Sequence, residues 1–194
     1  MTQNLGPFHN RKDEWQLYQP LVGSSMLELG NKINGSEVYK DFFESIGYNH
    51  TSIDMNGLDG ALEIDLSKPV DLGQFDMISN IGTTEHVGER NNWDGQQQCW
   101  KNILNAMRVG SVLVSVTPAP GHWSHHGIWY PGLEFFENLA KDNGLEVERL
   151  YTETPKWANG KLRDLNFARL RRIEDRPAAV SRDGMSRNFQ TGSA

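Results

Sequence analysis

The sequence predicts an α/β protein whose single domain is built on a doubly wound, mostly parallel sheet of seven strands. Short β-branched runs alternate with amphipathic helical patterns through most of the chain, an order typical of parallel sheets covered by helices. The last two predicted strands follow each other across a turn with no helix between them, so they predict a C-terminal antiparallel hairpin. A length of 194 residues suits one such domain.

The first half of the chain carries four of these strands and one helix. The strands are 26–29, 50–53, 61–64 and 75–79. The helix presents Val38, Phe42 and Ile46 on one face, because they recur at a spacing of about four residues. Ser36 is the predicted N-cap, since its hydroxyl can accept hydrogen bonds from the free N–H groups of a first turn, and Gly47 ends the helix.

The second half carries two helices and the other three strands. One helix begins near Gln96 and turns at Val109-Gly110 into a strand, and the other begins at Leu133 and stops at Asn143-Gly144. The strands are 111–116, 145–151 and 165–170. A turn at Asn159-Gly160 joins the last two strands into the hairpin.

Two end segments differ from the predicted central domain, residues 25–172. In residues 1–24, the apolar side chains between Trp15 and Val22 predict a short helix that either packs at the N-terminus or covers a cleft. Residues 173–194 have few large apolar side chains and many Arg, Ser, Gly and Asn, so they predict a flexible tail. The arginines of this tail either stay solvated or contact an anionic partner.

Composition and charge exclude several classes of protein. Cys99 is the only cysteine, so neither an intrachain disulfide nor a zinc site built from cysteines can form. No apolar run approaches the roughly 18 residues of a membrane-spanning helix, and the first residues lack the apolar stretch of a signal peptide. We therefore expect a soluble cytoplasmic protein. The net charge of −6 does not indicate nucleic acid as a partner, although a local basic patch could bind it, and nothing in the sequence predicts the oligomeric state.

Acidic residues and a glycine stand at the ends of three predicted strands. They are Glu28 and Gly30, Asp54, and Asp65. In a doubly wound sheet, ligands bind beyond the carboxyl ends of the strands. A glycine lets the backbone approach a ligand there, and a carboxylate can accept hydrogen bonds from both hydroxyls of a ribose. Each residue alone is also typical of a turn or a cap, so it is their order that indicates a ligand site.

Five segments continue this order along the chain. They are Met26–Gly30, Ser52–Asp54, Phe75–Asn80, Glu85–Val87 and Met107–Val114. Together they resemble the class I S-adenosylmethionine-dependent methyltransferases, which have a Rossmann-like fold closed by such a hairpin. The resemblance implies direct transfer of a methyl group from S-adenosylmethionine to a soluble acceptor, either a small molecule or a nucleotide-like compound.

The resemblance also implies which residues bind the cofactor. They are Glu28, Gly30, Asp54, Met55, Asp65, Leu66, Asn80 and Ile81. The first two would lie beside the methionine part of the cofactor. Asp54 would bind the ribose hydroxyls with Met55 against the adenine, and Asp65, with Leu66 beside it, would bind the adenine amino group. The last two would lie under the transferred methyl group. The loop after Gly30 carries residues 31–34 where the family usually has more glycine, which leaves a non-catalytic protein of the same fold as one alternative.

Histidines are the candidates for catalysis, because an acceptor that loses a proton needs a base and histidine most often supplies it. His86 follows the fourth strand beside the expected cofactor site, where it acts as a base or, with Glu85, orders the loop. His122 and His126 belong to the segment 121–127, which follows the fifth strand and holds half of the six histidines. This segment positions the acceptor, packs as a solvated loop, or contributes to a metal site.

Two further alternatives depend on neighbouring residues. Metal-assisted O-methyltransferases of small-RNA ends and of quinone precursors resemble this region, with Glu and Glu-His after the fourth strand. Gly82 stands where they have the first Glu, so only Glu85 and His86 match, and we assign no metal ligand. A nicotinamide-dependent enzyme is disfavoured, because Gly30 opens no G-x-G-x-x-G pattern and the closing hairpin does not belong to that fold.

Overall fold

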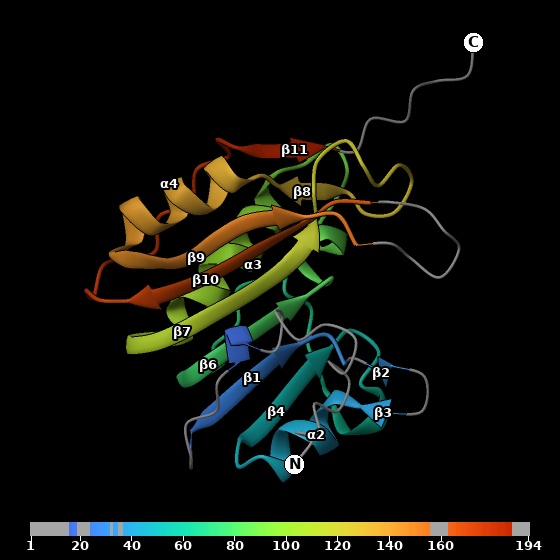
Figure 1. Cartoon of the computed structure of the whole chain (residues 1–194), viewed down its shortest axis with the longest axis vertical. Helices are drawn as coiled ribbons and strands as arrows, with labels where there is room; N and C mark the ends of the chain where they lie inside the picture. Colours follow the sequence, from blue (N-terminus) through green and yellow to red (C-terminus); the bar gives the residue numbers. More distant parts are fainter. Residues whose placement is uncertain (1–15, 19–23, 32, 35–36, 156–162, 188–194) are drawn as a thin grey trace.

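The computed structural model describes residues 16–18, 24–31, 33–34, 37–155 and 163–187. The strands of its main sheet are β1 (Ser25–Leu29), β4 (Asn49–Asp54), β5 (Leu62–Glu63), β6 (Phe75–Ile81), β7 (Met107–Pro118), β9 (Leu145–Glu153) and β10 (Leu165–Arg172). These seven strands lie in the order β5-β4-β1-β6-β7-β10-β9 (Figure 1). The first five are parallel, and β10 is antiparallel to β7 and β9. This architecture confirms the predicted sheet and its C-terminal hairpin.

Helices cover both faces of the sheet. They are α2 (Tyr39–Ser45), α3 (Asp94–Asn105) and α4 (Leu133–Asn143), with 3-10 helices η2 (Gln16–Tyr18), η3 (Leu58–Gly60) and η4 (Thr84–His86). Successive side chains of a strand point to opposite faces, so Leu27 and Ile78 pack in the core with α3 and α4. Met26 and Met77 pack in the second core, with α2 and η2. The central strands are thus buried on both sides, which explains their apolar sequences.

The start of β7 differs from the sequence prediction, which placed a helix end and a turn there. Met107 pairs with Phe75, and the register then shifts before Met77 pairs with Val112. The Ser111 hydroxyl accepts a hydrogen bond from the Arg108 N–H at 2.9 Å, inside this bulge. A strand interrupted by a bulge has no clean period of two, so the sequence pattern concealed its first residues.

Four short strands were not predicted. They are β2 (Ile33–Asn34), β3 (Glu37–Val38), β8 (Trp129–Pro131) and β11 (Met185–Arg187). β2 pairs with β3 in one antiparallel ribbon, and β8 pairs with β11 in another. Two- and three-residue strands are too short to show a periodic pattern.

The C-terminal segment differs from the predicted flexible tail for residues 173–187. Val180 and Met185 are buried in the core beside α3 and α4, and β11 ends the segment as a paired strand. Few apolar side chains suffice here because polar groups hold the backbone. Gln97 of α3, for example, donates a hydrogen bond to the Val180 carbonyl at 2.9 Å. Residues 188–194 of the predicted tail lie outside the described residues.

At the N-terminal end, the structure describes only η2 of the predicted helix. Tyr18 is buried there, and its hydroxyl hydrogen bonds with Ser79 at 3.1 Å. Several predicted features lie outside the described residues: Trp15, Leu21, Val22, the N-cap Ser36 and the turn Asn159-Gly160. Among the helices that the structure describes, none is long and apolar enough to cross a membrane.

Candidate active site

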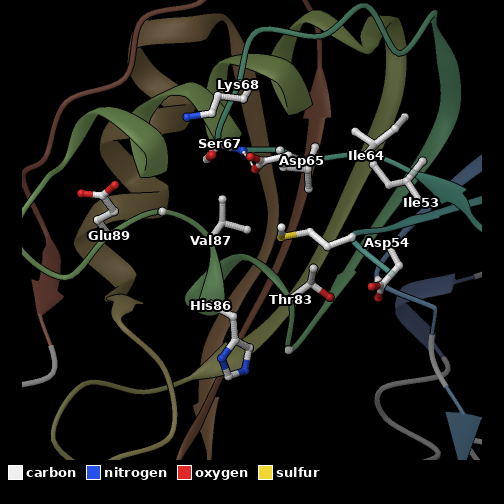
Figure 2. Close-up of a pocket in the computed structure, with 15 residues that line it drawn as sticks. Ile53, Asp54, Ile64, Asp65, Ser67, Lys68, Thr83, His86, Val87 and Glu89 are labelled. Atoms are coloured by element: carbon white, nitrogen blue, oxygen red, sulfur yellow. Dashed lines mark hydrogen bonds between the residues drawn. The ribbon is translucent and has the colours of Figure 1, made fainter. Parts of the chain in front are cut away.

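A cavity of about 560 Å³ opens at the carboxyl ends of β1, β4, β5 and β6 (Figure 2). Its lining consists of Gly30, Ile53, Asp54, Met55, Ile64, Asp65, Leu66, Ser67, Lys68, Gly82, Thr83, His86, Val87, Gly88 and Glu89. Five of the eight residues predicted to bind a cofactor belong to this lining, namely Gly30, Asp54, Met55, Asp65 and Leu66. The structure therefore brings them together where the parallel strands end, as the topology of such sheets leads us to expect.

The turn after β1 places backbone rather than a side chain at the cavity wall. Gly30 has a positive φ of 76°, and its N–H donates to the Ile53 carbonyl at 2.8 Å. A β-carbon on Gly30 would collide with the Thr83 hydroxyl, which itself donates to the Leu29 carbonyl at 2.7 Å. Only glycine fits this position, because both the backbone angle and the Thr83 contact exclude a side chain.

Asp54 is held in one orientation at the end of β4. Its Oδ2 accepts a hydrogen bond from the Asn31 N–H at 3.2 Å, and its Oδ1 accepts one from the Asn56 N–H at 3.1 Å. A carboxylate oxygen can accept more than one hydrogen bond, so both oxygens keep lone pairs for a ligand. The following residue, Met55, is 68% exposed at the rim of the cavity.

Asp65 is oriented in a similar way by the residues after it. The Ser67 N–H donates to Asp65 Oδ1 at 2.9 Å. Hydrogen bonds from the Ser67 side chain and backbone outweigh the effect of burial, so they hold the pKa of Asp65 below its ordinary value. Asp65 is therefore an ionised acceptor at neutral pH, and Leu66 beside it is buried.

Three predicted cofactor residues do not line this cavity. Glu28 is buried and hydrogen bonds with His50 Nε2 at 2.9 Å. Asn80 is also buried, and its amide donates to the Thr84 and Ser115 hydroxyls, each at 2.9 Å. Ile81 ends β6 partly buried. Glu28 therefore links β1 to β4, and Asn80 links β6 to η4 and β7.

Glu85, in η4, is completely buried, and neither of its carboxylate oxygens has a hydrogen-bond partner among the described residues. Two imidazoles approach the same oxygen: Glu85 Oε1 lies 3.7 Å from His86 Nε2 and 3.6 Å from His126 Nε2. These separations exceed hydrogen-bond length. They are close to the spacing of about 3.4 Å between two donor atoms on one tetrahedral metal ion. One ligand atom from each of these three residues falls within 4.8 Å of the others.

The histidine loop, residues 121–127, is docked directly on Glu85. The Ile128 N–H donates to the Glu85 carbonyl at 2.7 Å, and a β-carbon on Gly127 would lie 2.8 Å from Glu85 Cγ. Tyr130 closes the loop, because its hydroxyl accepts from the Gly127 N–H at 2.7 Å and donates to the Trp123 carbonyl at 2.6 Å. The rest of the loop is thereby fixed beside η4.

The three predicted catalytic histidines do not form one cluster. His86 and His126 stand together, with ring centroids 4.8 Å apart and side chains 47% and 41% exposed. His122 instead pairs with Asp164, the Nε2–Oδ2 distance being 3.2 Å. Only His86 and His126 share Glu85, whereas His122 lies beside Asp164, directly before β10.

Comparisons with known proteins bear on the fold. No family model and no curated protein matches the chain. N-methyltransferase NodS from Bradyrhizobium japonicum, solved with S-adenosylhomocysteine, matches with a TM-score of 0.62 and 16% identity over 87% of this chain and 89% of its own. A 1,6-didemethyltoxoflavin-N1-methyltransferase from Burkholderia thailandensis matches with a TM-score of 0.62 and 14% identity, over 84% of this chain and 78% of its own. TehB from Haemophilus influenzae matches with a TM-score of 0.64 and 15% identity, over 84% of this chain and 62% of its own.

The chain has the class I methyltransferase fold. Within this methyltransferase fold, sequence reasoning missed several lining residues, above all Thr83, Ser67 and Lys68. Ser67 carried a usable signal, because an Asp followed two residues later by Ser is typical of a turn in which the carboxylate accepts a backbone hydrogen bond. Thr83 carried none, since its role depends on contact with Gly30 more than fifty positions earlier.

Proposed function

We propose that this protein transfers a methyl group from S-adenosylmethionine to a soluble acceptor, which we take to be a small molecule. The observation that carries the proposal is a pair of oriented carboxylates at one cavity: Asp54 ends β4, and Asp65 follows the neighbouring strand β5. NodS and the toxoflavin enzyme have the same fold and were solved with S-adenosylhomocysteine. The cavity volume also falls within the roughly 300–1,000 Å³ of small-molecule sites.

The residues at the cavity fit this cofactor. Asp54 would accept hydrogen bonds from the ribose hydroxyls, with Met55 against the adenine, and Asp65 would accept from the adenine amino group. Gly30 would place backbone against the methionine part, because it lines the cavity and carries no side chain. Uncharged lining such as Ile53 and Ile64 would contact the purine.

When bound, S-adenosylmethionine supplies an electrophilic methyl group on a positively charged sulfur. The protein's contribution is then to align the acceptor with that methyl group and to exclude competing water. His86 lines the cavity and His126 stands beside it, so the Nε2 atom of either can take the proton that an acceptor loses. His122, paired with Asp164, would help to position the acceptor.

Binding and transfer can be tested separately. We expect titration calorimetry to show saturable binding of S-adenosylhomocysteine to one site per chain, and NADH to show none. A screen of phenols, amines, carboxylic acids and nucleosides with methyl-labelled S-adenosylmethionine would then identify the acceptor. At about 1 mM cofactor, even a binding free energy of only about −4 kcal/mol gives detectable binding. Absence of binding at this concentration would therefore contradict the proposal.

Metal-assisted O-methyl transfer is a second candidate, favoured by the buried Glu85 carboxylate. An ionised carboxylate without hydrogen bonds is costly to bury, and a divalent ion would compensate its charge. Glu85, His86 and His126 would hold the ion, and one carboxylate with two imidazoles suits Zn²⁺, Co²⁺ or Fe²⁺ better than Mg²⁺. Such an ion would lower the pKa of an acceptor hydroxyl. Gly82 supplies no fourth side chain, so acceptor access stays open.

Cobalt binding tests this second candidate without any acceptor. We expect the chelator-treated protein to bind one Co²⁺ per chain, with the visible absorption of cobalt held by protein ligands. The Glu85→Gln and His126→Ala variants should bind Co²⁺ at least about tenfold more weakly. His125→Asn is the matched control: His125 lies in the same loop but at a φ of 60°, which Asn tolerates, and outside the three-residue group. Equal loss in this control would mean adventitious binding by exposed imidazoles.

A further inference from the structure

The C-terminal segment, residues 173–187, is anchored along its whole length to the helical side of the domain. At its start, Arg172 donates to the Arg176 carbonyl at 2.7 Å and to the Leu104 carbonyl at 2.6 Å. In its middle, the side chain of Asn143 and the backbone of Ala179 exchange two hydrogen bonds, each of 2.7 Å. A segment held by contacts of this kind can fix the position of the elements that it touches, whereas a loose tail cannot.

The end of this segment fits tightly against β8 and the start of α4. β11 pairs with β8, Met185 opposite Pro131 and Arg187 opposite Trp129. Figure 1 shows the two strands side by side at the end of the sheet that carries β9. The Gly132 N–H donates to the Gly184 carbonyl at 2.9 Å.

Gly132 and Gly184 leave no space at this contact. A β-carbon on Gly184 would overlap the backbone of Phe135, and one on Gly132 would lie 2.9 Å from the Gly184 oxygen. Backbone atoms on both sides cannot move aside as a side chain could, so the two glycines set how closely the start of β11 approaches the end of β8 and the first turn of α4.

β8 in turn continues directly from the histidine loop. Tyr130, in the middle of β8, is the residue whose hydroxyl holds Gly127 and Trp123. Trp129 is held by the C-terminal segment as well, because the Arg182 guanidinium lies 5.1 Å from its ring centroid. The Trp129 indole N–H donates to the Glu89 carbonyl at 3.2 Å, which ties β8 to the wall of the cavity.

We propose that Gly184 and β11 position the histidine loop, so that the last described residues of the chain complete the acceptor side of the site. The chain of contacts runs from Gly184 through Gly132 and Tyr130 to Gly127, and from there to Glu85. The three residues proposed to hold the cofactor, Gly30, Asp54 and Asp65, belong to other elements and are not part of this chain of contacts. The role in the reaction rests on the proposed function, whereas the positioning itself does not.

Amide hydrogen exchange can test the positioning directly. Gly184→Ala and Gly132→Ala disturb the packing of this segment at two neighbouring points, against Phe135 and at the Gly184 carbonyl. Gly132 has a φ of −78°, so alanine there adds no backbone strain. Gly73→Ala is the matched control: its φ of 75° equals that of Gly184 within one degree, and no atom lies within 4 Å of an added β-carbon. The probes are the amides of Gly127 and Ile128, which donate to the loop contacts.

We expect both contact variants to exchange these two amides at least about tenfold faster than the wild type, and Gly73→Ala to leave them unchanged. S-adenosylhomocysteine should bind all three variants within about threefold of the wild type, which also shows that they are folded. Unchanged exchange in both contact variants would refute the positioning role. Failure of the wild type to bind S-adenosylhomocysteine would refute the proposed function and leave the exchange result standing.

Discussion

Replacing Asp54 with alanine should weaken S-adenosylhomocysteine binding more than any other single change at the cavity. The carboxylate is already oriented by the Asn31 and Asn56 N–H groups, so no ordering is needed when ribose hydroxyls bind. A hydrogen bond to a charged group contributes about 1.5–3 kcal/mol. Asp54 is only partly buried, so the lower end of this range applies.

Two ribose hydrogen bonds at that lower end amount to about 3 kcal/mol, which corresponds to about a hundredfold increase in Kd. Asp54→Asn keeps one acceptor oxygen without the charge and should give about a tenfold increase. The stability of the variants should change by less than about 1 kcal/mol, because water can replace the carboxylate at the partly exposed Asn31 and Asn56 amides.

Titration calorimetry at one salt concentration, with melting curves of the same samples, measures both quantities. Glu63→Ala is the matched control, because Glu63 pairs with Asp54 in the sheet, carries the same charge and does not line the cavity. It should change Kd by no more than about threefold, since exposed charges are screened. An increase below about fivefold in a folded Asp54→Ala variant, or an equal effect of Glu63→Ala, would refute the assignment of Asp54 to the ribose.

Two other predictions concern the loop and the sheet edge. Gly127→Ala places a β-carbon 2.8 Å from Glu85 Cγ, so urea unfolding should show a loss of about 1–3 kcal/mol, and the exposed Ser124→Ala in the same loop should show almost none. Burial would raise the pKa of Glu148, but hydrogen bonds from two β10 arginines outweigh it and hold the pKa below its ordinary value. Glu148 therefore stabilises the fold above its unfolded-state pKa of about 4.3, and this contribution disappears as the pH falls through the lower folded-state pKa. Melting curves should show Glu148→Gln less stable than the wild type at pH 7 and equal to it in acid; a constant difference across this range would contradict the reasoning.

The elements that the sequence predicted well are those with a local periodic signal. The main-sheet strands and the three α-helices follow from apolar patterns of four or more residues, although β5 keeps only two residues of its predicted four. The elements that were not predicted lack such a periodic signal. The first residues of β7 are hidden by a bulge, and β8 and β11 pair over only three residues.

At the candidate site, too, the sequence pattern predicted some residues correctly and others not. Asp54 and Asp65 could be predicted because the carboxyl ends of adjacent parallel strands must meet at one edge, wherever the loops lie. Glu28 obeys the same sequence rule but is paired with His50, since side chains alternate along β1 and its carboxylate lies on a buried face. The sequence pattern cannot distinguish a strand-end acid that faces a cavity from one that faces a buried histidine.

Periodicity and chain direction were enough to predict the order of strands and helices along the chain, the closing hairpin and the carboxylates at the strand ends. The folded structure was needed to show that His126 approaches Glu85 while His122 does not, and that residues 173–187 pack on the domain. Those contacts join residues about forty or more positions apart through glycines and single backbone hydrogen bonds. Close approach of that kind depends on how loops close in three dimensions, and it leaves no periodic trace in the sequence.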